Sequence, residues 1–145
     1  MAVSPMGLAN DDGSLDGCNA TSDGRRGWLG GRRDGTDDRG RTLVNARQGE
    51  IWWAEAEGKR RAVLMVTRSE AIPVLNWIVV APVTRTVRSI PTEIPLGETH
   101  GLGGPCAASF DNLQPIRTTF LTSRLGEVPF PRREICRTLA AMADC

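Results

Sequence analysis

The sequence predicts an α+β domain, mainly β: a small, strongly curved sheet or open barrel of five or six short strands with one C-terminal helix. A disordered N-terminal segment precedes it. Three observations support this fold class. Short stretches with strand-like apolar patterns follow one another from Arg47 to Val128. Polar, glycine-rich or proline-containing runs separate these stretches. A helical apolar period is found at the C-terminal end, from Pro131 to Ala143.

The composition changes abruptly near Ala46 and divides the chain in two. Residues 1–46 hold nine glycines, seven aspartates and six arginines, with only scattered apolar residues. Such a segment cannot bury enough surface to offset the entropy of ordering it, so we expect disorder there. A reading frame that truly begins just before Arg47 is the alternative. Residues 47–145 are expected to form the folded domain, which is small enough to make dimerisation plausible.

The first expected strand, Glu50–Glu55, alternates well. Ile51 and Trp53 point one way, whereas Trp52 and Ala54 point the other. The polar run at 57–60 predicts a hairpin turn. Residues 62–67 (AVLMVT) are apolar on both faces, which is typical of a central strand.

The rest of the domain is expected to alternate short strands with loops. Its elements are a loop at 68–75, a buried strand at 77–83, an edge strand at 91–96, a glycine-rich loop at 97–105, a strand at 106–111 that could continue past a bend at 113–116, a helical turn at 118–123 and a last strand at 125–128. In the closing helix, Ile135, Leu139 and Met142 share one face. Trp53 and Trp77 are assigned to the core.

Charge and composition exclude several classes of function. Residues 47–145 carry twelve basic and ten acidic residues, so RNA contacts would have to come from a local cluster. Four dispersed cysteines and one histidine make a metal site or other cofactor unexpected. No apolar run of about 18 residues is present, so we expect no membrane span. A cytoplasmic protein with reduced thiols is predicted.

Several short motifs in register resemble a known family. They are R-Q-G-E-I-W-W at 47–53, R-A-V-L-M-V-T-R at 61–68, V-V-A-P-V-T at 79–84, P-T-E-I-P-L at 91–96, F-D-N at 110–112 and L-G-E-V at 125–128. In this order, with the terminal helix, they resemble the MazF/PemK family of bacterial toxins. The resemblance covers essentially all of residues 47–145.

The resemblance implies an SH3-like barrel of the CcdB/PemK type and a type II toxin–antitoxin function. Members are homodimeric, sequence-specific, metal-independent endoribonucleases that cut single-stranded RNA, inhibit translation and are held inactive by a cognate antitoxin. Contact with DNA would be only indirect, through the antitoxin. Two departures from the family pattern concern RNA contacts: Arg61-Ala62 replaces Arg-Pro, and Asp111-Asn112 replaces Asp-Gln.

Metal-free cleavage of RNA requires the ribose 2′-hydroxyl to attack its own phosphate, giving a 2′,3′-cyclic phosphate and a 5′-hydroxyl. A pair of catalytic histidines is excluded, because His100 is the only histidine. Arg61 matches the family's catalytic arginine, and its guanidinium suits phosphate oxygens. It is a poor base, since its pKa exceeds about 12. The alternative is a surface arginine paired with Glu55 or Glu57.

Thr84 and Asp111 match two further family positions. The Thr84 hydroxyl would donate to the phosphate or hold the substrate in line, and Asp111 would act as a base or orient the substrate. The alternatives are a β-branched residue that ends a strand and a turn-capping carboxylate. The residues expected to contact RNA are Glu50, Arg68, Arg85, Arg88 and Asn112.

Some of these contacts have structural alternatives. Glu50 could instead support the loop at Arg47, and Arg85 and Arg88 could belong to a solvated loop. Trp52 would either stack on a base or lie in the core or a dimer interface. Two other functions are retained: a non-enzymatic toxin of the same fold that binds a protein such as DNA gyrase, and an inactive copy.

Overall fold

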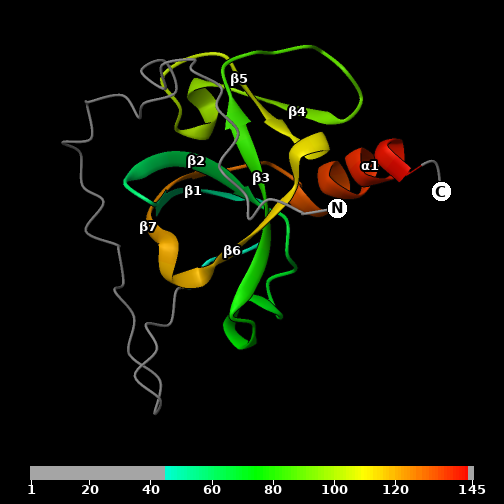
Figure 1. Cartoon of the computed structure of the whole chain (residues 1–145). Coiled ribbons are helices and arrows are strands. Elements are labelled where there is room, and N and C mark those ends of the chain that lie inside the picture. The colour runs from blue at the N-terminus through cyan, green and yellow to red at the C-terminus, as the bar shows by residue number, and fades with distance from the viewer. Residues whose placement is uncertain (1–44, 144–145) are drawn as a thin grey trace, which may run out of the picture.

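Seven short antiparallel strands form a curled sheet in the computed structural model, which describes residues 45–143 (Figure 1). The strand order is β4-β5-β3-β2-β1-β7, and β6 pairs with β3. One helix, α1, covers part of the sheet. The elements are β1 (Glu50–Ala56), β2 (Lys59–Met65), η2 (Ile72–Val74), β3 (Trp77–Thr84), β4 (Glu93–Leu96), η3 (Glu98–His100), β5 (Cys106–Ser109), η4 (Phe110–Asn112), β6 (Gln114–Arg117), η5 (Thr118–Phe120), β7 (Leu121–Glu127) and α1 (Pro131–Ala143).

The predicted mainly-β class with one C-terminal helix is confirmed, although the sheet has seven strands rather than five or six. The expected continuation at 113–116 is a separate strand, β6, because η4 breaks the chain after Ser109. The helical turn predicted at 118–123 is wrong beyond Phe120. Leu121 already pairs with Ala54 of β1, and the backbone bonds offered by that edge override the local preference.

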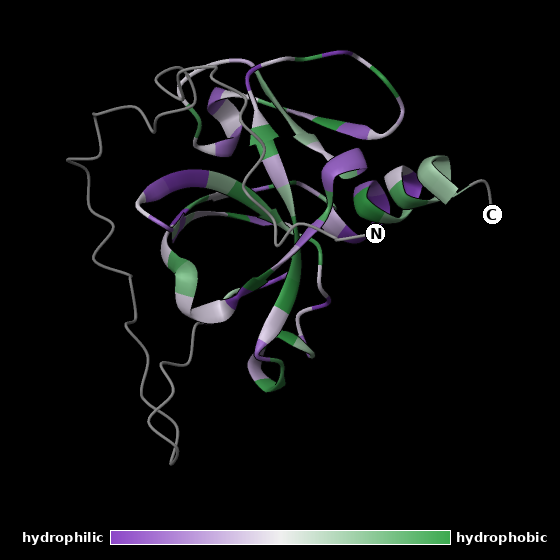
Figure 2. Cartoon of the chain, in the orientation of Figure 1, coloured by the Kyte–Doolittle hydropathy of each residue, from purple (hydrophilic) through white to green (hydrophobic). Residues whose placement is uncertain are grey.

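The β1–β2 hairpin has a shorter turn than the polar run at 57–60 suggests. Ala56 pairs with Lys59, so only Glu57 and Gly58 form the turn, with φ of 52° and 73°. Positive φ at both central residues is typical of a two-residue type I′ turn. β2 therefore begins with three basic residues, which lie at its hydrophilic end in Figure 2.

β3 pairs with three different strands along its length. Residues 77–80 pair with β6, residues 80–82 pair with β2, and Val83 and Thr84 pair with β5. β3 therefore joins the part of the curled sheet that contains β1, β2 and β6 to the part that contains β4 and β5. It also leaves Thr84 at the point where the β4–β5 pair joins the rest of the sheet.

Two hydrophobic clusters fill the two faces of the sheet, as the apolar pattern of residues 62–67 predicts. Ala62 and Leu64 belong to the first cluster, with Phe110 and Ile135, whereas Val63 belongs to the second. Figure 2 shows this hydrophobic character along the strand centres. Apolar burial on both faces is the main favourable term for so small a domain.

The core assignment of Trp77 is wrong, and that of Trp53 is confirmed. Trp53 is 6% exposed, whereas Trp77 is 51% exposed and Val79 is 40% exposed. Both exposed residues alternate with Ile78 and Val80, which point into the second cluster. The Arg117 guanidinium lies 5.1 Å from the Trp77 ring centre, but this face of β3 stays largely exposed at this end.

α1 has the predicted limits, but its buried face differs from the prediction. Ile135 and Thr138 are buried, Leu139 is partly buried, and Met142 is 44% exposed, so Met142 does not belong to the buried face. The Thr138 hydroxyl donates to the Glu134 carbonyl at 2.8 Å, which satisfies this buried polar group. The buried stripe is therefore short, covering one turn near the start of the helix.

The predicted disorder at 1–46 falls almost entirely outside the described residues. Ala46 is 3% exposed and packs into the second cluster, so packing begins one residue before Arg47. The edge position predicted for 91–96 is confirmed, since β4 ends the strand order. Cys106 is buried and disulfide-bonded, which corrects the expectation of reduced thiols for this residue. No helix among residues 45–143 is long and apolar enough to cross a membrane.

Candidate active site

Arg61 lies on β2, opposite Ala54 of β1. The residue is half-buried, and its Nε atom is shielded from solvent. The ion pair with Glu55 considered for Arg61 is made by Arg60, whose Nε lies 3.4 Å from Glu55 Oε1. The Arg60 guanidinium also stacks over Trp53, 4.5 Å from the ring centre. The two neighbouring arginines therefore have different surroundings.

The β2–β3 pairing ends close to both Arg61 and Thr84. Its last pair is Val63 with Pro82, and Arg61 and Thr84 each lie two residues away from this pair on their own strand. Side chains two residues apart share a face of a strand. Arg61 thus shares the face of Val63, and Thr84 shares the face of Val80. These two valines both belong to the second cluster. The guanidinium and the hydroxyl extend this apolar face at its polar end.

The Thr84 hydroxyl can form further hydrogen bonds. Its oxygen accepts the backbone N–H of Thr86 at 3.2 Å, and the side chain is half-buried. A hydroxyl has one proton to donate and two lone pairs, so this bond leaves the proton available. Donation to a phosphate oxygen is compatible with the observed geometry.

Asp111 is not at the end of a strand, as the sequence suggests, but in η4. It lies four residues beyond Ala107, the β5 residue that pairs with Thr84. The Asp111 Oδ2 atom accepts the hydroxyl of Thr92 at 2.8 Å, and the side chain is exposed. This contact ties η4 to the residue before β4, in agreement with the structural alternative for this carboxylate.

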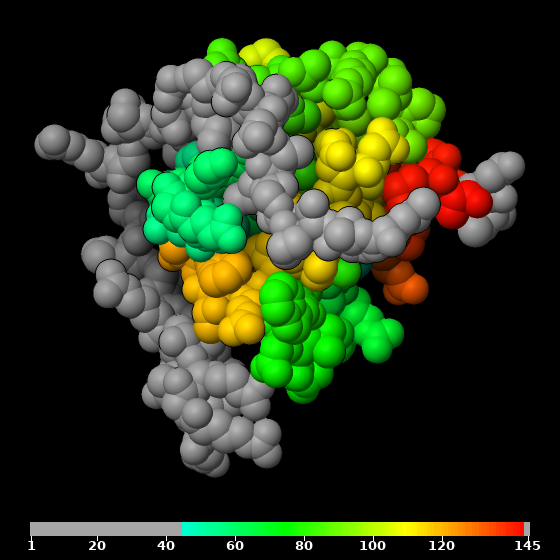
Figure 3. Space-filling model, viewed as in Figure 1, coloured from blue at the N-terminus to red at the C-terminus, as the bar shows by residue number. Residues whose placement is uncertain are grey.

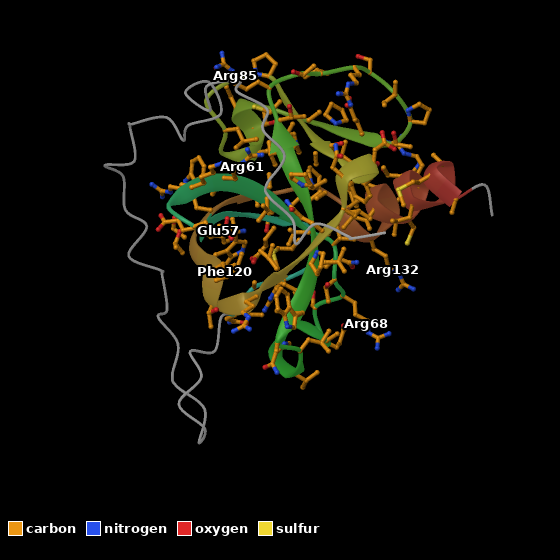
Figure 4. All side chains as sticks on the ribbon, in the orientation of Figure 1. Glu57, Arg61, Arg68, Arg85, Phe120 and Arg132 are labelled. Atoms are coloured by element: carbon orange, nitrogen blue, oxygen red, sulfur yellow. The ribbon has the colours of Figure 1, made fainter. Side chains whose placement is uncertain are left out.

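Arg85 and Arg88 belong to the exposed loop 85–92, which begins directly after Thr84. Figure 4 shows Arg85 and Arg61 in the same upper part of the molecule. The backbone N–H of Arg88 donates to Glu93 Oε2 at 2.9 Å. In η4, Asn112 Nδ2 donates to Ser109 Oγ at 3.0 Å. Loop 85–92 forms the top of the molecule in the space-filling view (Figure 3).

Glu50 and Arg68 lie away from Arg61. Arg68 follows β2, and Figure 4 shows it at the opposite end of the molecule from Arg61. Glu50 is buried at the start of β1, where its Oε1 accepts Arg124 Nε at 2.9 Å. Its Oε2 accepts the backbone N–H of Arg47 and Trp52 Nε1, each at 2.9 Å. These bonds agree with the supporting role considered for Glu50 and hold Trp52 against the second cluster.

His100 takes part in a tight loop contact and lies outside the candidate site. Its Nδ1 accepts the backbone N–H of Gly97 at 3.1 Å. Desolvation by burial lowers the pKa of His100 from its ordinary value. A Cβ at Gly126 would stand 2.0 Å from the His100 carbonyl oxygen, so this glycine allows β7 to approach the loop.

Sequence reasoning missed three buried polar residues on the same face of the sheet. Ser109 pairs with Glu93 across β5 and β4, and Gln114 pairs with Val80 across β6 and β3. All three polar side chains are more than nine-tenths buried. A glutamate at the start of an apolar strand was the available signal for Glu93. The others could not be identified without the strand pairing.

The arrangement can hold an anionic group on the polar end of the second-cluster face. It supplies one guanidinium, one hydroxyl and the arginines of loop 85–92. Such donors can stabilise negative charge that develops on phosphate oxygens. Within residues 45–143, no three His, Cys, Asp or Glu side chains gather as a metal-ion site.

Residues 47–142 match the model of a family described as PemK-like, MazF-like toxin of type II toxin-antitoxin system. The chain is 36% identical over 107 residues to the probable endoribonuclease MazF5 of Mycobacterium tuberculosis. That alignment covers 72% of this chain and 97% of the relative.

Solved structures give the same result for the fold. The Mycobacterium tuberculosis toxin MazF-mt6 is 32% identical, with a TM-score of 0.60, over 66% of this chain and 96% of the toxin. A mycobacterial endoribonuclease in complex with its cognate antitoxin is 24% identical, with a TM-score of 0.57, over 68% of this chain and 95% of its own. The second likeness concerns the fold alone.

Proposed function

Since the chain belongs to the PemK-like, MazF-like toxin family of type II toxin–antitoxin systems, we propose that it is a sequence-specific endoribonuclease that cleaves single-stranded RNA. One observation carries this proposal. Arg61 and Thr84, which match the family's site positions, lie on one face of neighbouring strands, each two residues from the Val63–Pro82 pair. A guanidinium and a hydroxyl at one site suit a phosphodiester that develops extra negative charge.

The proposed reaction is an attack of the ribose 2′-hydroxyl oxygen on the adjacent phosphorus. The 2′-hydroxyl loses its proton, the bond to the 5′-oxygen of the next nucleotide breaks and that oxygen takes up a proton, which leaves a 2′,3′-cyclic phosphate and a 5′-hydroxyl. Arg61 stabilises the charge on the non-bridging oxygens, and Thr84 donates a hydrogen bond to the same phosphate. Arg61 does not serve as the base, because a guanidinium keeps its proton at every pH below about 12.

The other predicted contacts have different support. Arg85 and Arg88 are proposed to bind flanking nucleotides, because their loop, 85–92, directly follows Thr84. Asn112 is proposed to do the same from η4, where it bonds to Ser109 of β5. Asp111, which lies in η4, is proposed to orient the substrate. Glu50 and Arg68 are left out of this set, since neither lies near Arg61.

The test is cleavage of single-stranded RNA by the purified protein in the presence of a chelator. Arg61→Ala is expected to lower kcat about a hundredfold, because a comparable transition-state contact contributes about 3 kcal/mol. Arg60→Ala is the matched control, since Arg60 pairs with Glu55 instead. Circular dichroism would confirm that both variants fold. Equal losses in the two variants, or a requirement for metal, would contradict the proposal.

We further propose a homodimer that acts in the cytoplasm, inhibits translation and is neutralised by a cognate antitoxin, with DNA reached only through the antitoxin. The family description supports the antitoxin partner. The gyrase-binding alternative finds no support among the relatives described above, since MazF5 is named a probable endoribonuclease. Toxicity that survives in Arg61→Ala would revive it.

A further inference from the structure

The Glu93 carboxylate is buried with only one of its oxygens bonded. Glu93 is 5% exposed, and its Oε2 accepts the backbone N–H of Arg88 at 2.9 Å. Its Oε1 is also enclosed, and no described residue donates a hydrogen bond to it. Unpaired buried oxygens are rare in folded proteins, and a charged one is especially costly. A buried carboxylate oxygen in this state suggests a donor supplied by a ligand.

Glu93 lies on the face of the sheet that carries Thr84. Ile94 belongs to the first cluster, so Glu93, its neighbour on β4, points to the opposite face. By the same alternation, Val83 belongs to the first cluster and Thr84 points away from it. Ser109, which pairs with Glu93, occupies the strand between them.

The strand pairing also fixes how far Glu93 is from Thr84. Thr84 pairs with Ala107, and Ala107 pairs with Pro95, two residues beyond Glu93. With strands about 4.8 Å apart and about 3.4 Å per residue, the Cα atoms of Glu93 and Thr84 are separated by about 12 Å. This places Glu93 beside the phosphate site rather than in it.

We propose that Glu93 determines sequence specificity by accepting, at Oε1, a hydrogen bond from the exocyclic amino group of a base that flanks the cleaved linkage. The inference rests on the proposed RNA cleavage at Arg61 and Thr84. An ionised carboxylate only accepts hydrogen bonds. It can therefore accept a hydrogen bond from the amino group of cytosine, adenine or guanine. The carbonyl oxygens that flank the uracil N3–H would repel it.

Loop 85–92 provides the way in. Residues 85–90 are all exposed. The described bonds that hold their backbone are Thr86 N–H to Thr84 Oγ1, Arg88 N–H to Glu93 Oε2 and Glu93 N–H to the Ile90 carbonyl. Thr92, at the end of the loop, is held by the Phe110 N–H and by Asp111. Residues 85–90 are exposed and bury little surface, so local opening of this part costs less than opening of the strands. Opening it removes the Arg88 bond and exposes the carboxylate to a base.

The experiment measures binding of short RNAs that cannot be cleaved because the attacking 2′-hydroxyl is methylated. Each flanking position carries each of the four bases in turn, or cytosine with its 4-amino group replaced by hydrogen. At one position, wild type is expected to bind the amino-bearing bases about tenfold more tightly than uracil or the amino-deleted cytosine. Glu93→Gln is expected to remove this difference, because its amide can donate to carbonyl oxygens. Glu98→Gln, at an exposed acid near β4, is the matched control.

Three outcomes would overturn the inference: no amino-group preference in wild type, an unchanged preference in Glu93→Gln, or an equal loss of affinity for every RNA. The last would make Glu93 only a support for loop 85–92. If Glu93→Gln fails to fold, Glu93→Asp takes its place, and withdrawing the oxygen by one methylene must shrink the amino-group effect. Wild type that binds with this preference but cleaves no unmodified RNA would instead contradict the proposed cleavage alone.

Discussion

The neighbouring residues Arg60 and Arg61 show how position on a strand separates two identical side chains. Arg60 pairs with Glu55 and stacks on Trp53, whereas Arg61 shares the face of Val63 and Thr84. A strand reverses its side chains at every residue, so a shift of one position would exchange these surroundings. The proposed catalytic role therefore depends on register as much as on residue type.

The Thr84 hydroxyl gives a prediction at this scale. Thr84→Val removes the hydroxyl at nearly constant volume, and we expect kcat for RNA cleavage to fall about 10- to 100-fold, because one donated hydrogen bond is lost in the transition state. Thr84→Ser keeps the hydroxyl and should retain most of the activity. Single-turnover cleavage rates provide the measurement. Equal rates for the valine variant and wild type would show that the hydroxyl takes no part.

His100 gives a pH prediction. Burial lowers the pKa of His100 in the folded state, and its Nδ1 must stay unprotonated to accept the Gly97 N–H. The unfolded chain then binds a proton more readily than the folded one. Stability is therefore retained above the ordinary histidine pKa and lost as the pH falls below it.

The measurement is the melting temperature at pH 7.5 and pH 5.5. From pH 7.5 to pH 5.5, the melting temperature of wild type should fall more than that of His100→Asn, whose side chain cannot titrate in this range. Parallel pH profiles for the two proteins would refute the assignment.

Turns and short contacts between elements limit the tolerance of this small sheet. Gly49 and Gly58 both have positive φ, 84° and 73°, but their surroundings differ. A Cβ at Gly58 would meet nothing within 4 Å, whereas a Cβ at Gly49 would stand 2.0 Å from Pro131 Cβ. At Gly58, the hairpin turn requires only a residue that tolerates positive φ. At Gly49, the contact with α1 also requires a residue without a Cβ atom.

The two alanine variants separate these effects. Gly58→Ala should lower the free energy of unfolding by about 1 kcal/mol through backbone strain, which corresponds to roughly 4–8 °C in melting temperature. Gly49→Ala adds a clash with α1, and we expect a loss of about 3 kcal/mol or more. Denaturant titration measures both. Similar losses would mean that α1 shifts easily away from β1.

At the scale of the whole molecule, two hydrophobic clusters form the core of the described residues, 45–143. Their described members lie between Ala46 and Leu139. We propose that this part of the chain folds by itself, as the composition of the N-terminal segment suggests. Deletion of residues 1–44 should leave the melting temperature within a few degrees of wild type.

Wild type and the deletion variant must both be melted in a reducing agent, because Cys106 is disulfide-bonded. The difference in melting temperature then contains no contribution from this disulfide. Deletion of residues 1–46, which also removes buried Ala46, gives the contrasting variant and should be less stable. A large loss on removing residues 1–44 alone would show that the N-terminal segment supports the fold.

The amino-acid sequence by itself determined the elements and the family: alternating apolar residues predicted β1, a run that is apolar on both faces predicted β2, the helical period predicted α1 within its observed limits, and motifs in register indicated the toxin family. Local patterns report which residues prefer strand or helix, and they are sufficient where a segment is buried on a definite face. They failed at Leu121, where an available strand edge overrode the local preference, and at Trp77, whose apolar character does not reveal that its face is uncovered. The position of Arg61 and Thr84 on one face of neighbouring strands, the displacement of Asp111 into η4 and the half-satisfied Glu93 carboxylate were decided only by tertiary structure. Each depends on which strands become neighbours and in what register, and that is set by packing across the whole sheet.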